Sequence, residues 1–153
     1  MELRAKLQAA TKDAMKAKDS ERLSTLRLIG AAIKDREIAL RGGDTDGVLT
    51  EGDLVAILSR MVKQRQESAK AYEEGGRLEL AEKEENEIRI IQEYLPRQLD
   101  EAETANAIDT VIDDLGATGI RDMGRVMAEL RVRHAGQMDF GAAGPKVKAR
   151  LLN

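Results

Sequence analysis

Four glutamates, Glu82, Glu84, Glu85 and Glu87, form the densest group of side chains in this sequence that could do acid–base or metal chemistry. Neighbouring carboxylates can act as general acid and base, or can bind a hard cation. No histidine stands at a ligand-like interval from them, and a run of glutamates in a helical segment is typical of a solvated face. We therefore predict no metal site and no catalytic carboxylate pair here.

Residues that could act as nucleophiles or bases are few. The 153-residue chain has no cysteine, and its serines at 24, 59 and 68 fall inside expected helices. The single histidine, His134, stands near Gly136 at an expected helix end, where a histidine interacts favourably with the helix dipole. A structural role is therefore preferred over that of a general base. The glycine-rich residues 42–47 lack the Lys-Ser/Thr pair of a phosphate-binding loop. We predict no catalytic residue and no cofactor, and expect that the chain is not an enzyme by itself.

Basic residues are concentrated at the two ends of the chain. The net charge is −3, but residues 1–41 hold 10 Lys and Arg against 6 Asp and Glu, residues 42–120 hold 8 against 19, and residues 121–153 hold 7 against 3. Such segregation can mark a surface that binds a polyanion. The candidate RNA-binding residues are those of the last segment: Arg121, Arg125, Arg131, Arg133, Lys146, Lys148 and Arg150.

The expected mode of RNA binding is contact with phosphates. The chain has three aromatic residues, too few to stack single-stranded bases, whereas cations on rigid helices suffice for a folded RNA. Arg121 and Arg125 are four residues apart and so share a helix face, as do Lys146 and Arg150. The alternative interpretation is that these cations merely balance the acidic helix expected over residues 100–115.

The elements that must position these residues are all helices, since the chain is 42% hydrophobic with few aromatics. We predict an all-α protein with a four-helix N-terminal unit, residues 1–96, and a three-helix C-terminal bundle, residues 97–153. Ser20 is the expected cap of the second helix, and Thr50 and Asp100 open the third and fifth with capping boxes. The fourth helix is expected to continue to Pro96, and the last to run, distorted, through Pro145.

The fifth helix, after Asp100, is expected to bury a stripe made of Ala105, Ile108, Ile112 and Leu115.

Residues 63–99 predict an antiparallel helical hairpin that turns at Gly75 and Gly76, because glycine readily adopts the left-handed conformation that ends a helix. A fold about Gly76 places Arg65 opposite Glu87, and Ser68 opposite Glu84. We interpret these four residues as a structural polar seam between the two helices rather than a catalytic set.

Four segments in this order resemble the stand-alone GatB/YqeY family: RLSTLRLIGAAIKDREI at 22–38, KQRQESAKAYEEGGR at 63–77, EIRIIQEYLPRQL at 87–99 and MGRVMAEL at 123–130. Related domains occur at the tail of the B subunit of the tRNA-dependent amidotransferase and on some glutaminyl-tRNA synthetases, where they contact tRNA. The resemblance therefore implies a role in translation, as a non-catalytic accessory of tRNA, of an aminoacyl-tRNA synthetase or of an amidotransferase. One alternative is a protein-interaction adaptor that uses the acidic hairpin. A more distant one is carbon–nitrogen ligase activity, with glutamine as amido donor, within an amidotransferase complex.

The N-terminal residues MELRAKLQAATKDAMK lack the apolar core of a signal peptide, and no apolar run is long enough to cross a bilayer. The chain also has no cysteine to form disulfides. We therefore expect a cytoplasmic protein that does not bind a membrane.

Overall fold

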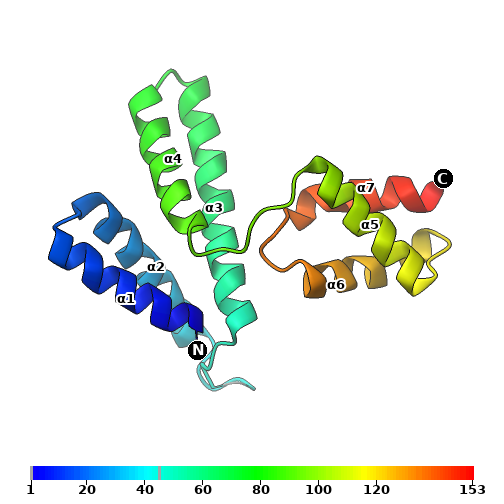
Figure 1. The fold of residues 1–153 in the computed structure, drawn as a ribbon, viewed down its shortest axis with the longest axis horizontal. Coiled ribbons are helices and arrows are strands. Elements are labelled where there is room, and N and C mark those ends of the chain that lie inside the picture. The colour runs from blue at the N-terminus through cyan, green and yellow to red at the C-terminus, as the bar shows by residue number, and fades with distance from the viewer. Residues whose placement is uncertain (1, 45) are drawn as a thin grey trace. The chain divides into compact units, whose positions relative to one another are not determined.

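Helices make up all the regular secondary structure in the part of the chain that the computed structural model describes, residues 2–44 and 46–153, and the predicted all-α class is confirmed. In chain order they are α1 Glu2–Ala17, α2 Ser20–Ala39, α3 Glu51–Glu74, α4 Leu78–Gln92, α5 Glu101–Leu115, the 3₁₀ helix η1 Ile120–Asp122, α6 Met123–Arg133 and α7 Phe140–Leu152 (Figure 1). The chain divides into two compact units, Met1–Leu95 and Pro96–Asn153, each with its own hydrophobic core.

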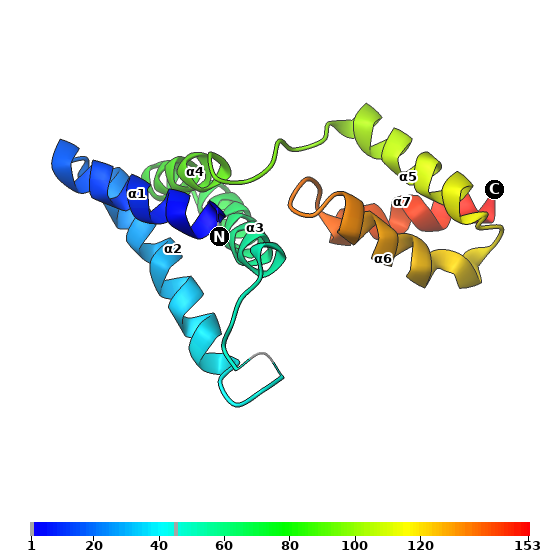
Figure 2. The same ribbon diagram turned by 60° about the horizontal axis from the view of Figure 1, so that its bottom comes forward.

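The N-terminal unit consists of two helical hairpins, α1–α2 and α3–α4, which lie side by side in pairs in both views (Figures 1 and 2). Its core is aliphatic, as expected, with Ile29 of α2, Leu54 and Leu58 of α3 and Ile91 of α4 at 1% exposure or less. Removing such side chains from water is the main source of stability for helices of this length.

The α3–α4 hairpin forms as its sequence predicts. Thr50 and Asp53 make a reciprocal capping box at the start of α3, and Gly76 takes the left-handed conformation, with φ 72°, in the turn. The fourth helix, however, ends at Gln92 rather than running on to Pro96. The residue before a proline is disfavoured in the helical conformation, which moves the end of the helix upstream.

The segment after α4 is bound to the start of α2. The Arg22 guanidinium donates to both carboxylate oxygens of Glu93, at 3.2 and 2.8 Å, and to the Tyr94 hydroxyl at 3.5 Å. The hydrogen bond with Glu93 is the main cause that raises the pKa of Arg22 above its ordinary value. Asp19, not Ser20 as predicted, caps α2, since its side chain accepts from the Arg22 amide.

The C-terminal unit is a bundle of α5, α6 and α7 around Ile108, Val111, Val126, Leu130 and Val147, none more than 1% exposed. The predicted capping box of Asp100 and Glu103 opens α5. Helix α7 is continuous through Pro145, as predicted.

The prediction of the buried face of α5 is wrong: the face that is buried is rotated by part of a turn from the predicted one. The buried residues are Thr104, Ala107, Ile108 and Val111, while the predicted Ala105, Ile112 and Leu115 are half-buried. Apolar residues occupy both stripes, so the positions of α6 and α7 decide which one is covered. None of the helices described here is long and apolar enough to span a membrane.

Candidate nucleic-acid interface

Two of the seven predicted RNA-binding residues are paired with carboxylates of the acidic helix α5. Arg133 Nη1 lies 2.7 Å from Asp114 Oδ2, and Arg150 Nη1 lies 2.9 and 3.0 Å from the two oxygens of Asp109. Arg133 also donates from Nε to Glu129 at 2.9 Å. Its hydrogen bonds, first with Asp114 and then with Glu129, raise the pKa of Arg133. For these two cations the structure matches the alternative interpretation, in which they balance α5.

A third predicted cation, Arg125, contacts a residue at the start of its own helix, α6. Arg125 Nε donates to Asp122 Oδ1 over 3.1 Å, while Asp122 Oδ2 accepts from the Thr118 amide at 2.9 Å. These contacts, the Thr118 amide foremost, lower the pKa of Asp122. Arg125 therefore helps to fix the turn that precedes α6.

Four predicted cations remain outside ion pairs among residues 2–44 and 46–153. Arg131 lies over the ring of Phe140, 5.8 Å from its centroid, and Arg121, Lys146 and Lys148 are exposed. Their surroundings are not strongly basic, because Pro96–Asn153 carries eight Lys and Arg against nine Asp and Glu, a net charge of −1. Among the described residues, three of the seven predicted cations are therefore ion-paired and four are not.

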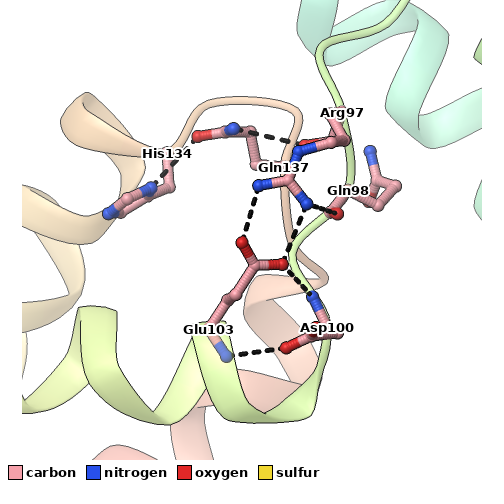
Figure 3. A network of polar contacts seen from close by, with 6 residues as sticks. All are labelled: Arg97, Gln98, Asp100, Glu103, His134 and Gln137. Atoms are coloured by element: carbon pink, nitrogen blue, oxygen red, sulfur yellow. Dashed lines mark hydrogen bonds and ion pairs between the residues drawn. The ribbon is translucent and has the colours of Figure 1, made fainter.

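Sequence reasoning missed a polar network at the entrance to the C-terminal unit (Figure 3). The entering segment, residues 97–99, is hydrogen-bonded to the loop between α6 and α7: the Leu99 amide donates to Gln137 O at 2.9 Å, and Gln137 Nε2 donates to Arg97 O at 3.2 Å. Gln98 Nε2 donates to the carbonyl of Gly136. These bonds attach the loop between α6 and α7 to residues 97–99, the segment that begins the unit.

Charged groups complete this network. Arg97 binds Glu103 through two nitrogens, at 2.9 and 2.6 Å, and the Asp100 amide donates to the same carboxylate at 3.1 Å. Arg97 first, and the Asp100 amide second, lower the pKa of Glu103 to about 2. His134 caps α6, with Nδ1 3.0 Å from Gln137 Oε1, so its imidazole orients the loop. The sequence revealed only the Asp100–Glu103 capping box of this network, because Gln98 and Gln137 belong to no periodic pattern.

In the N-terminal unit, Arg65 Nε donates to Glu87 Oε2 over 2.9 Å, with side chains only 15% and 13% exposed. Arg65 Nη1 also donates to Met61 O at 3.2 Å. No hydrogen bond joins the other predicted seam pair, Ser68 and Glu84, in the described structure; both residues are half-buried. Of the two predicted polar pairs between α3 and α4, the described structure therefore forms one, the ion pair of Arg65 with Glu87.

Within residues 2–44 and 46–153 there is no group of three or more His, Asp or Glu side chains that could hold a metal ion. His134, the one histidine, is hydrogen-bonded to an amide and not to a hydroxyl or carboxylate.

Comparison with known proteins decides the family. A family profile described as Yqey-like protein matches residues 4–151, nearly the whole chain. The chain belongs to the YqeY-like family.

Curated relatives agree with this assignment. The protein "Altered inheritance of mitochondria protein 41, mitochondrial" of Eremothecium gossypii is 34% identical over 151 residues, which cover 96% of this chain and 79% of the relative. The proteins of the same name from Lachancea thermotolerans and Vanderwaltozyma polyspora are 38% identical over 91 and 84 residues, covering 60% and 55% of this chain. The matches span 46% and 43% of those two relatives, less than half of their length.

The predicted cytoplasmic location is wrong by this comparison, because the curated relatives are named as mitochondrial proteins. The composition of a folded domain does not reveal its compartment, since targeting signals are read from separate segments.

Proposed function

We propose that this YqeY-like chain is a non-catalytic accessory protein that binds folded tRNA and positions it for a tRNA-charging or tRNA-amidating enzyme. The observation that carries the proposal is that Arg121, Lys146 and Lys148 project from the helical bundle of the C-terminal unit without forming an ion pair among the described residues. Cations held on rigid helices can contact phosphates at fixed spacing. The family resemblance supplies tRNA as the RNA class.

The aromatic residues favour phosphate contact over base stacking. Tyr72, Tyr94 and Phe140 are all half-buried, and Phe140 lies beneath the Arg131 guanidinium. Single-stranded RNA is usually bound by exposed aromatic platforms. A folded tRNA, recognised by shape and backbone, fits this surface better than an unstructured strand.

The test is a fluorescence anisotropy titration of a tRNA transcript at several salt concentrations. If the four unpaired cations of this unit, Arg121 and Arg131 with Lys146 and Lys148, each neutralise one phosphate, the logarithm of the affinity should fall by about 3 units per tenfold rise in salt. Arg121→Glu with Lys148→Glu should weaken binding at least tenfold. As a control for a cation that is already paired, Arg150→Gln removes the partner of Asp109, and affinity should change less than threefold. Absence of binding at low salt by the folded chain would refute the proposal.

A second candidate function is favoured by one observation at the tip of the α3–α4 hairpin. Leu78 and Leu80 are 68% and 40% exposed, next to the exposed Glu79 and Glu82. Apolar side chains with acidic neighbours suit a basic segment of a protein partner. A photo-crosslinker at position 78 that captures a tRNA-handling enzyme in the absence of RNA would favour this adaptor function, while Arg121→Glu would then leave capture unchanged.

A further inference from the structure

A shallow groove runs between α1 and α2 of the N-terminal unit. Polar residues from both helices form its rim, and its floor is apolar but nearly inaccessible, with Ile29 and Ile33 at 1% and 6% exposure. These polar residues are Arg4, Gln8, Thr11, Lys34 and Glu37, and Gly30 completes the rim.

The glycine on this rim has no structural explanation within the chain. Gly30 lies in the middle of α2, where glycine is less stable than alanine. A Cβ atom at this position would meet no described atom within 4 Å, so neither packing nor a close helix contact requires its absence. A missing side chain does, however, allow an external group to approach the helix backbone.

Two cations of α2 flank Gly30 along the helix: Lys34 lines the groove, whereas Arg27 is not among its lining residues. Arg27 precedes Gly30 by three residues and Lys34 follows it by four, so all three share one face of α2. Both cations are exposed, and neither forms an ion pair in the described parts of the chain. The acid on the rim, Glu37, is bound to Arg4 across the groove at 3.0 Å. With Arg4 and Glu37 paired, Lys34 leaves one positive charge on the rim, and Arg27 adds a second on the same face of α2 outside the groove.

We propose that the face formed by Arg27, Gly30 and Lys34 binds the phosphate backbone of folded RNA, as a second contact surface in addition to the C-terminal unit. This inference rests on the proposed function. Phosphate fits better than a protein side chain, because the groove and the adjoining face of α2 offer two cations and an amide donor, Gln8, but no accessible apolar pocket for an anchoring residue. Close approach at Gly30 places a phosphate between the two cations.

Three variants of the full chain test this surface by anisotropy with the same tRNA transcript. Arg27→Glu with Lys34→Glu should weaken binding at least tenfold and reduce the salt slope by about 1.5, the value for two phosphates. Gly30→Leu should weaken binding about tenfold without lowering the melting temperature, because the added side chain enters open space and leucine is the better helix former. The control, Arg60→Glu with Lys70→Glu, makes the same charge change at exposed positions of α3 and should alter affinity less than threefold.

Each result that differs from these expectations would contradict a specific part of the proposal. If the parent chain binds tRNA and the groove variants bind equally well, the groove is not a contact surface, while the C-terminal unit keeps its role. Equal losses in groove and control variants would show that only net charge matters, and would also overturn the site. If the parent chain binds no tRNA, both the proposed function and this inference fail. Binding of polyglutamate at the groove in place of RNA would assign the surface to a protein partner.

Discussion

Breaking the ion pair between Arg65 and Glu87 should destabilise the N-terminal unit. An exposed ion pair contributes about 0–1 kcal/mol, whereas removing one partner of a buried pair costs about 3–5 kcal/mol. With side chains 15% and 13% exposed, this pair lies closer to the buried limit, so we expect Arg65→Met to cost about 2–3 kcal/mol, including the lost bond to Met61 O. Methionine keeps the apolar stem of the side chain and isolates the loss of the charged group.

The measurement is urea unfolding followed by circular dichroism, with the melting temperature as a second readout. For a unit of this size, 1 kcal/mol corresponds to about 4–8 °C, so the expected decrease is about 10–20 °C. Arg65→Met with Glu87→Leu should be less destabilised than the sum of the single variants, because both members of the pair are then removed. A loss below about 0.5 kcal/mol, or strict additivity, would refute the structural role. Unchanged stability with lost RNA binding would reassign the pair to function.

Three further predictions concern other parts of the molecule. In an NMR titration Glu103 should show a pKa of about 2. Because the pKa in the folded state is lower than the unfolded value of about 4.5, the contribution of Glu103 to stability is complete above about pH 4.5 and is lost as the pH falls through 2. Arg97→Gln should raise this pKa towards 4.5, but not fully, since the Asp100 amide still donates; an unchanged value would exclude Arg97 as its main cause. Leu130→Ala should cost about 2–5 kcal/mol, with faster amide hydrogen exchange in Pro96–Asn153 and unchanged exchange in the other core. The purified chain should release no ammonia from glutamine above a heat-denatured control, and release abolished by a point substitution would contradict a non-catalytic role.

Local chemistry explains which parts of the fold could be predicted. The capping boxes of Thr50 with Asp53 and of Asp100 with Glu103 involve residues three apart, so they form wherever the helix begins. The mirrored positions about Gly76 likewise depend on a short turn and two regular helices, with no knowledge of the remaining chain.

Tertiary contacts explain what could not be predicted. Arg133 and Arg150 look available in the sequence, and only the packing of α6 and α7 against α5 shows that Asp114 and Asp109 neutralise them. Conversely, nothing in the sequence distinguishes Arg27 and Lys34 from the other charged residues of the N-terminal segment. Only the folded chain shows that neither forms an ion pair among the described residues, and that Lys34 lines a groove beside Gly30.

The connection between the two units is very short. Leu95 packs on the core of the N-terminal unit, and Arg97 is held by Glu103 in the C-terminal unit, so Pro96 alone separates the two attachments. One residue spans at most about 3.6 Å, and proline fixes one of its two backbone dihedrals. If both proposed RNA-binding surfaces bind, such a short tether keeps them at high effective concentration for one another. A ligand able to reach both would therefore be chelated, with an avidity up to about 10²–10⁴ times either single affinity. Inserting a flexible linker after Leu95 should lower that avidity while leaving each single contact intact.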